Sequence, residues 1–180
     1  MSSRALDKIS DLFFAIGDAI IAADIGVRVG NYDDFNGKVE DATVLIEIER
    51  TGPALRGNDG RKGHRVTVTL HAVVARWRQF SALEATNLAT CLERLATDNR
   101  WGLPGRQCGV PEDQSSGPSM FQNGADGYNA WSTSWTQWVS IGEELFEDPI
   151  VSGVPKVAYS WEVTDFDDAS QYQPLEVPES

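Results

Sequence analysis

The clearest alternation of hydrophobic and polar positions lies in the middle of the chain. Every second position is apolar, namely Val66, Val68, Leu70, Ala72 and Val74. The positions between them are polar as far as His71 and become apolar afterwards. Because successive side chains of a strand point to opposite faces, this pattern predicts a strand with one buried face. The second face is expected to be covered only near the end of the strand.

A helical period follows this strand directly. Apolar residues recur at three- and four-residue spacing from Ala85 onward, and polar residues occupy the opposite side. Ser81 precedes Glu84 by the three residues of a capping box, and Phe80 is placed to pack on Ala85 as a hydrophobic staple. The helix is predicted to end near Asn99, before a Trp-Gly-Leu-Pro-Gly turn.

The same criteria predict the remaining elements. They are an amphipathic helix over residues 3–23 and strands over residues 25–29, 42–50, 129–141 and 157–163. Residues 51–63 contain four glycines and a proline and are predicted to form a flexible hairpin tip. Residues 103–130 contain three prolines and five glycines, which predicts a long irregular connection.

This element order predicts one two-layer α+β domain. Its two main helices should pack on one face of a largely antiparallel, mixed sheet of about four to six strands. The folded core is expected to span residues 1–164. Residues 165–180 are acidic and contain prolines, so they are expected to form a loose tail.

The charge of the chain is unevenly distributed. The net charge is −12, but residues 1–106 carry 14 basic and 14 acidic side chains, whereas residues 107–180 carry 13 acids and Lys156 alone. Such a chain would be repelled by a phosphate backbone, which argues against a protein that coats nucleic acid. An acidic solvated surface or a basic protein partner is expected instead.

The two cysteines are too few for a disulfide framework, which predicts a reducing compartment. Cys91 is expected on the apolar side of a helix and Cys108 in a loop. No apolar run approaches the roughly 20 residues of a membrane helix, and no signal peptide is expected.

Candidate catalytic groups are few. His71 is interpreted as a hydrogen-bonded surface residue, and no Cys/His cluster has the spacing of metal ligands. Glu143 and Glu144, with Glu147 and Asp148, have the chemistry of an acid/base pair, but a dense acidic run is more typical of a solvated face. Three tryptophans, Trp131, Trp135 and Trp138, suit a sugar-binding platform or, at strand spacing, core and interface packing. No enzymatic activity, metal or cofactor is predicted.

Three segments carry a resemblance to a known family. They read GRKGHRVTVTLHAVVARW, LEATNLATCLERLATDNRWGLPG and GYNAWSTSWTQWVSIG. Over residues 40–142 the chain resembles small tail-completion proteins of long-tailed bacteriophages, including Mu-like ones. Its element order is similar to that of phage tail terminators, which form a hexameric ring at the head-proximal end of the tail tube.

The resemblance implies a structural virion protein without catalytic residues or cofactor. It implies a homo-oligomer, a hexamer in tail terminators, that contacts the tail tube protein on one side and a head–tail connector or neck protein on the other. The protein would be assembled in the cytoplasm of a bacterial host and reside in the tail or neck of the virion. It would not contact a membrane, and DNA would at most pass through the lumen of the ring.

Nine residues are candidates for subunit and partner contacts. They are Arg56, Arg61, Lys62, Arg65, Trp131, Trp135, Trp138, Glu143 and Glu144. The basic loop over residues 50–65 is expected to reach a neighbouring subunit, so replacing Arg56, Arg61 and Lys62 with serine should weaken tail joining without unfolding the subunit. Another neck component and a tryptophan-rich carbohydrate-binding module remain the alternatives.

Overall fold

The computed structural model describes residues 5–122, 124, 127–146, 158–159, 164 and 168–174. The chain divides into two compact units, residues 1–146 and residues 147–180. In the second unit β6 (Ala158–Tyr159) pairs antiparallel with β7 (Gln173–Pro174), and a short 3-10 turn, η2 (Ala169–Gln171), precedes β7. The remainder of the strand predicted over residues 157–163, and most of the predicted acidic tail, lie outside the described residues.

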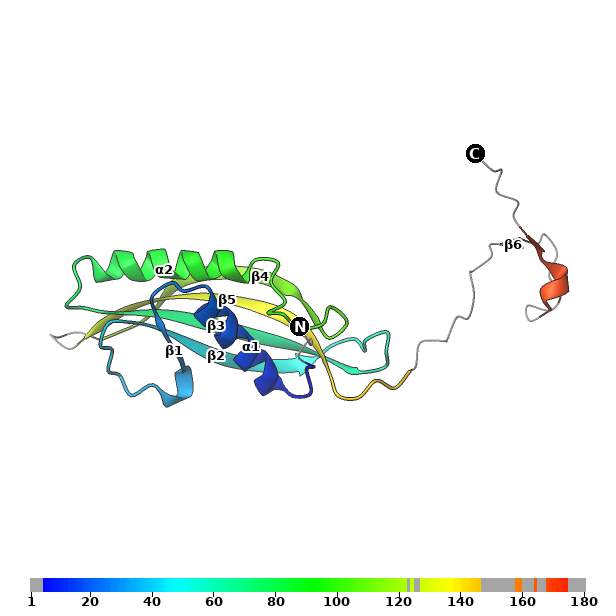
Figure 1. Cartoon of the computed structure of the whole chain (residues 1–180). Coiled ribbons are helices and arrows are strands. Elements are labelled where there is room, and N and C mark those ends of the chain that lie inside the picture. The colour runs from blue at the N-terminus through cyan, green and yellow to red at the C-terminus, as the bar shows by residue number, and fades with distance from the viewer. Residues whose placement is uncertain are drawn as a thin grey trace, which may run out of the picture. The chain divides into compact units, whose positions relative to one another are not determined.

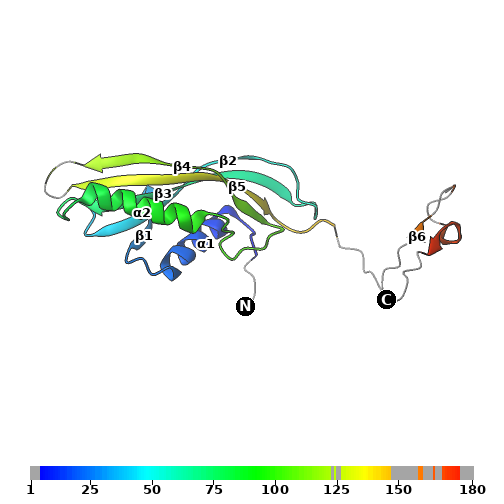
Figure 2. The same ribbon diagram turned by 90° about the horizontal axis from the view of Figure 1, so that it is seen from above.

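The first unit is the predicted two-layer α+β domain. Its strands are β1 (Arg28–Asn31), β2 (Ala42–Pro53), β3 (Lys62–Ala75), β4 (Cys108–Gln122) and β5 (Tyr128–Ile141). They form one sheet in the order β1-β2-β3-β5-β4, in which only the β1–β2 pair is parallel. The helices α1 (Ile9–Ala22) and α2 (Ser81–Ala96) pack on the same face of this sheet (Figures 1 and 2).

The core lies between the helices and the sheet. Val66, Val68 and Leu70 of β3 are fully buried against residues of both helices, as their alternation predicts. The opposite face of the sheet is covered only at one end, where the segment that follows β1 packs on Val73 and Tyr128. The expected change in the second face of β3 is therefore confirmed.

The prediction of an irregular connection over residues 103–130 is wrong. Most of this segment is β4, a 15-residue strand paired with β5. Proline is compatible with a strand at the edge of a sheet, since its missing N–H can face away from the neighbour. Pro111 and Pro118 both lie in this edge strand, and three register shifts absorb the irregular sequence. A pattern interrupted by bulges does not alternate regularly, which is why periodicity missed it.

The capping box predicted for α2 does not form. The helix begins at Ser81 itself, whose hydroxyl accepts a hydrogen bond from Asn129 Nδ2 at 2.8 Å. Glu84 instead forms an ion pair with Arg78 at 2.6 Å. Phe80 is the N-cap residue in a left-handed conformation, with φ of 61°, and its side chain is 71% exposed. The expected staple between Phe80 and Ala85 is therefore also absent.

The N-terminal elements are displaced from their predicted bounds. The first helix begins at Ile9 instead of residue 3, because the Asp11 carboxylate accepts hydrogen bonds from the backbone N–H groups of Asp7 and Lys8 and fixes the first turn there. The first strand begins at Arg28 instead of residue 25. The β2–β3 hairpin is confirmed, but both strands extend into the predicted loop and leave residues 54–61 as its tip.

Candidate functional site: two apolar ends of one sheet

The paired strands β3 and β5 give the first unit two well-separated ends. Fourteen residue pairs join them, from Ala75 opposite Tyr128 to Lys62 opposite Ile141. At about 3.3 Å per residue this ladder is roughly 43 Å long. Exposed hydrophobic side chains gather at both ends, but the residues and the local structure differ.

The first group lies where β3 ends and α2 begins. Trp77, Phe80 and Leu83 are 68%, 71% and 61% exposed, and we call them the helix-start patch. Leu83 also lines an adjacent groove of about 500 Å³ between α2 and the strands β4 and β5. The other lining residues include Met120 and Trp131, so the patch and the groove form a mainly apolar surface.

The left-handed backbone conformation of Phe80 destabilises the isolated subunit. A non-glycine residue in the left-handed region is disfavoured by about 1–2 kcal/mol, because its Cβ approaches the carbonyl oxygen. The exposed phenyl ring buries too little surface to offset this cost. An exposed aromatic side chain on a strained backbone is typical of a contact surface and not of a core.

The second group lies at the tip of the β2–β3 hairpin. Leu55, Leu145 and Phe146 are 86%, 62% and 61% exposed, and we call them the hairpin patch. The backbone N–H groups of Leu145 and Phe146 both donate to the carbonyl oxygen of Asp59, at 2.9 and 3.1 Å. Gly60, at φ of 82°, lies under both side chains, and a Cβ there would be 2.8 Å from Leu145 Cβ and from the Phe146 ring.

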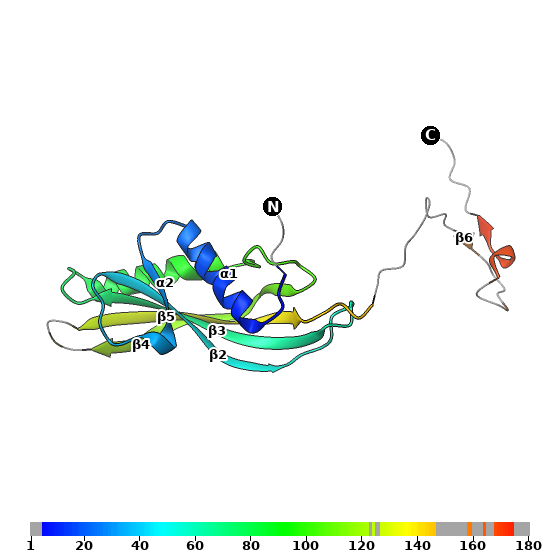
Figure 3. The same ribbon diagram turned by 60° about the horizontal axis from the view of Figure 1, so that its bottom comes forward.

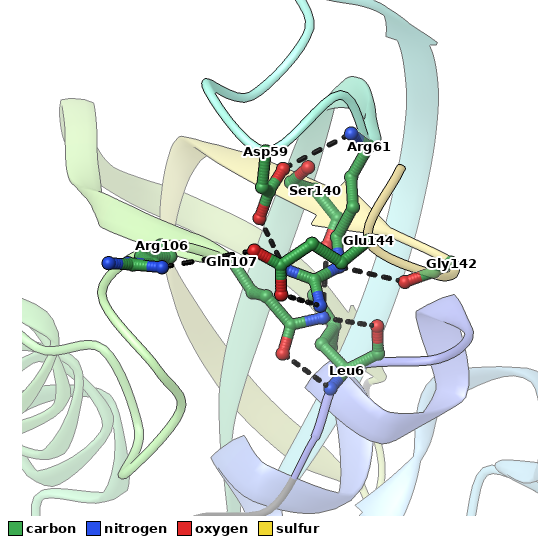
Figure 4. A network of polar contacts seen from close by, with 8 residues as sticks. All are labelled: Leu6, Asp59, Arg61, Arg106, Gln107, Ser140, Gly142 and Glu144. Atoms are coloured by element: carbon green, nitrogen blue, oxygen red, sulfur yellow. Dashed lines mark hydrogen bonds and ion pairs between the residues drawn. The ribbon is translucent and has the colours of Figure 1, made fainter. Parts of the chain in front are cut away.

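Ion pairs and hydrogen bonds hold the hairpin tip to the end of β5 (Figure 4). The Arg61 guanidinium is bonded to Asp59, donates to the Gly142 carbonyl at 2.9 Å and contacts Glu144 at 3.4 Å. Burial alone would raise the pKa of Asp59, but hydrogen bonds from the Arg61 backbone and side chain, together with its charge, lower it below the usual range. Arg106 lies 3.8 Å from the other oxygen of Glu144.

A second polar contact fixes the start of the chain at the same end (Figure 4). Gln107 accepts a hydrogen bond from Leu6 N at 3.2 Å and donates to Leu6 O at 3.0 Å. Its backbone carbonyl accepts from Ser140 N at 2.7 Å. This pairing explains why Leu6 is fully buried although it precedes the first helix.

Two of the nine candidate contact residues are used mainly within the subunit. Arg61 has a side chain only 16% exposed, and its guanidinium is bound to Asp59 and to the Gly142 carbonyl, which leaves little of it to contact a neighbouring molecule. Its replacement by serine would remove contacts of the fold, contrary to what was expected of the triple serine variant. Trp135 is 1% exposed and stacks on Trp101, with ring centroids 5.6 Å apart.

The other seven candidates remain at least partly accessible. Arg56, Lys62 and Glu143 are exposed, and Arg65 is 51% exposed and paired with Glu112. Three further candidates are partly occupied within the subunit. Trp131 lines the groove, Trp138 donates its indole N–H to Leu55 O, and Glu144 contacts two arginines.

Glu144 forms ion pairs with Arg61 and Arg106. Hydrolysis instead requires two carboxyl groups that act together as an acid/base pair. Glu147 and Asp148, which follow Glu144 in the sequence, lie outside the described residues. The three tryptophans expected to form a platform are divided among the groove, the core and the hairpin base. The structure therefore does not bring them together as one sugar-binding surface.

His71 lies in the interior and not on the surface as predicted. It is 8% exposed and is bonded through Nε2 to Glu47 at 2.8 Å and through Nδ1 to Ser119 at 2.6 Å. Tyr32 stacks on its ring at 4.7 Å. The order of hydroxyl, imidazole and carboxylate is that of a hydrolytic triad, but here the enclosed ring joins three strands of the sheet.

Cys108 opens a strand instead of lying in a loop. It is fully buried, and burial raises the pKa of its thiol to about 12, which keeps it protonated and unreactive. Among the described residues, no group of three or more His, Cys, Asp or Glu side chains is arranged to hold a metal ion. Neither described helix has the length and apolar character to cross a membrane.

No protein-family model matches this sequence, and no curated protein matches it. A functional interpretation therefore has to start from the structure itself, and the two exposed apolar patches at the ends of the sheet are its most prominent surface feature. None of the six patch residues is among the nine contact residues predicted from the sequence, and one of them, Phe80, was assigned to a hydrophobic staple. The available signal was that Trp77 and Phe80 follow the last alternating position of a strand and fall within a turn, where apolar side chains have no neighbouring strand to cover them.

Proposed function

We propose that this protein is a structural subunit that assembles head-to-tail into a closed ring and caps the head-proximal end of a phage tail tube. The ring would end polymerisation of the tube and provide the surface to which the head is joined. The observation that supports the proposal best is the pair of unlike apolar patches at opposite ends of one long sheet. The resemblance of residues 40–142 to tail-completion proteins supplies the biological setting.

The two patches suit a heterologous interface. A two-fold dimer places one patch against itself, whereas a ring requires that one surface complement a different surface on the next subunit. The helix-start patch offers a groove and three large side chains. The hairpin patch offers three side chains that project from a narrow tip fixed by Asp59. A projecting tip and a groove are complementary in shape, and both are apolar.

The electrostatic arrangement around the hairpin tip supports the same contact. Two arginines, Arg61 and Arg106, balance the two carboxylates of Asp59 and Glu144 within the subunit. An interface built on this tip would therefore bury no unpaired charge from these four groups, which would be costly. The tip is also preorganised by these bonds, which lowers the ordering cost of association.

The native mass of the full chain tests the assembly. Light scattering over a concentration series at two salt concentrations should give a ring, with six times the 19.8-kDa chain mass as the expected value for a hexamer. Introducing Leu83→Glu into the helix-start patch should shift the mass toward the monomer. Thr90→Glu, on the exposed side of the same helix, is the matched control and should leave the mass unchanged. A strict dimer, or equal effects of both variants, would contradict a head-to-tail ring.

A second measurement distinguishes a tube cap from another neck component. Purified tail tube protein is allowed to polymerise with and without this protein, and tube lengths are counted by electron microscopy. A cap should shorten the tubes and appear at one end only. A ring that forms normally but leaves tube length unchanged would favour a connector role over the terminator role.

A further inference from the structure

The hairpin patch is built from two parts of the chain. Leu55 belongs to the tip of the β2–β3 hairpin, whereas Leu145 and Phe146 belong to the segment that follows β5. Residues 142–146 form no helix or strand, and we call them the β5 extension. Figure 3 shows this extension leaving β5 beside the tip of the hairpin. The patch is therefore complete only while the β5 extension lies on the hairpin, which we call its closed position.

The contacts that hold the β5 extension are weaker than those of the strand before it. Its two backbone hydrogen bonds both end on the carbonyl oxygen of Asp59, and Glu144 contacts Arg61 and Arg106 at 3.4 and 3.8 Å. Ion pairs between partly exposed groups contribute little to stability. β5, in contrast, is joined to β3 by a ladder of fourteen residue pairs. We therefore expect the extension to open locally while β3 and β5 remain paired.

The closed position depends on Gly60 and buries little apolar surface by itself. A Cβ at Gly60 would lie 2.8 Å from the Leu145 Cβ and from the Phe146 ring, so a larger residue would displace the extension. In the closed position the side chains of Leu145 and Phe146 remain 62% and 61% exposed. A neighbouring molecule that covers these side chains would add the apolar burial that closure alone lacks.

We infer that the β5 extension opens and closes in the free subunit and that a neighbouring copy docks on the closed position, so that closure controls assembly. The inference rests on the proposed ring and adds a regulation of its hairpin contact. A neighbour that contacts Leu55, Leu145 and Phe146 together binds the closed position more tightly, because only closure brings these three side chains together. Such coupling is reciprocal, so a change that opens the extension must weaken assembly by the same factor.

Hydrogen exchange of the full chain, measured by mass spectrometry, tests the coupling. Leu83→Glu acts at the helix-start patch, at the opposite end of the sheet, so it prevents docking without touching the β5 extension. Amide exchange over residues 142–146 should be about tenfold slower in the assembled parent than in the Leu83→Glu monomer. The assembled Thr90→Glu control should match the parent. Equal exchange over these residues in the ring and in the monomer would overturn the inference.

The converse experiment opens the extension and measures assembly. Gly60→Ala should speed exchange over residues 142–146 and raise by about tenfold or more the concentration at which half of the chains are in rings. Gly52→Ala is the matched control, because it lies in the same hairpin and a Cβ there meets no atom within 4 Å. If Gly60→Ala also speeds exchange in β3, the deciding variant is Glu144→Gln, which removes the two ion pairs but keeps the size of the side chain.

The outcomes separate this inference from the proposed function. Rings that form at the concentration of the parent, although the extension of Gly60→Ala exchanges rapidly, would overturn the coupling and leave the proposed function standing. Equal loss of assembly in Gly60→Ala and Gly52→Ala would also overturn the coupling, since the position of the extension would then not decide the result. A parent chain that is monomeric at every concentration would refute the ring and the coupling together.

Discussion

The buried side chain of Gln137 should contribute more to stability than any exposed contact of the subunit. It is fully buried in β5, and its carbonyl oxygen accepts hydrogen bonds from the indole N–H groups of Trp101 and Trp135, at 3.0 and 3.1 Å. Its amide nitrogen donates to the carbonyls of Gly109 and Asn99, at 2.7 and 3.2 Å. One side chain thus joins β4, β5 and the segment that follows α2.

Replacement of Gln137 by leucine keeps the volume but removes all four of these bonds. A buried donor or acceptor that loses its partner costs about 1–3 kcal/mol, so four such groups cost about 4 kcal/mol at the least. The added apolar surface of leucine returns about 1–2 kcal/mol. We therefore expect Gln137→Leu to lower the free energy of unfolding by about 2 kcal/mol or more, out of about 5–15 kcal/mol for a typical domain.

Thr133 provides a matched control on the same strand and the same face. It is also fully buried, but its hydroxyl has no hydrogen-bond partner among the described residues. Thr133→Val should therefore leave stability unchanged or raise it by up to about 1 kcal/mol. Urea unfolding followed by tryptophan fluorescence measures both variants, since Trp101 and Trp135 report on this site. A loss below about 1 kcal/mol for Gln137→Leu would refute the reasoning.

Three further outcomes are expected. Cys91 should react with a thiol reagent in the native protein, whereas Cys108, whose pKa is raised to about 12 by burial, should react only after unfolding. In the unfolded chain the Cys108 thiol ionises above about pH 8.5, so the free energy of unfolding should fall as the pH rises above that value. Because the pKa of Asp59 is lowered in the folded protein, its carboxylate stabilises the fold at pH values above the ordinary carboxyl range, and this stabilisation is lost as the pH falls through the lowered value. Asp59→Asn should therefore be less stable than the parent near neutral pH. In a pH series of thermal unfolding, its stability should also depend less on acid pH than that of the parent. Phe80→Gly should leave the free energy of unfolding unchanged or raise it by up to about 1 kcal/mol, and it should weaken assembly. A marked loss of stability in calorimetry would show instead that the phenyl side chain of Phe80 supports the fold of the subunit.

The sequence predicted those elements whose pattern is regular and whose environment is local. β3 and α2 were correctly expected because their apolar positions keep one period along the entire element. The strand β5 was also expected, and its alternation puts Trp135 on one face with Gln137; the structure buries that face, although Trp135 was predicted as a contact residue. A period predicts which side chains share a face, and the face with more apolar side chains is the one that packs.

The elements that were missed depend on partners distant in the sequence. β4 is a strand because β5 pairs with it, and its prolines are tolerated because no other described strand pairs with its outer edge. Ser81 was expected to cap its own helix, but Asn129, 48 residues away, donates to its hydroxyl. Local sequence propensity cannot reveal either of these distant partners, β5 or Asn129. The same limitation placed Arg61 in a free loop, although Gly142 and Glu144 bind its guanidinium.

The candidate site shows the limitation most clearly, because exposure belongs to the tertiary structure. Trp77 and Trp135 are the same residue type in or beside strands, yet one is 68% exposed and the other 1%. Composition cannot separate them, and a search for tryptophans selects both. Backbone strain provides an independent criterion: Phe80 is exposed and also held at positive φ, so neither burial nor local conformation accounts for an aromatic residue there. A contact with another molecule accounts for both features at once, and this is why Phe80, more than any tryptophan, marks the surface that we expect to be covered in the assembled ring.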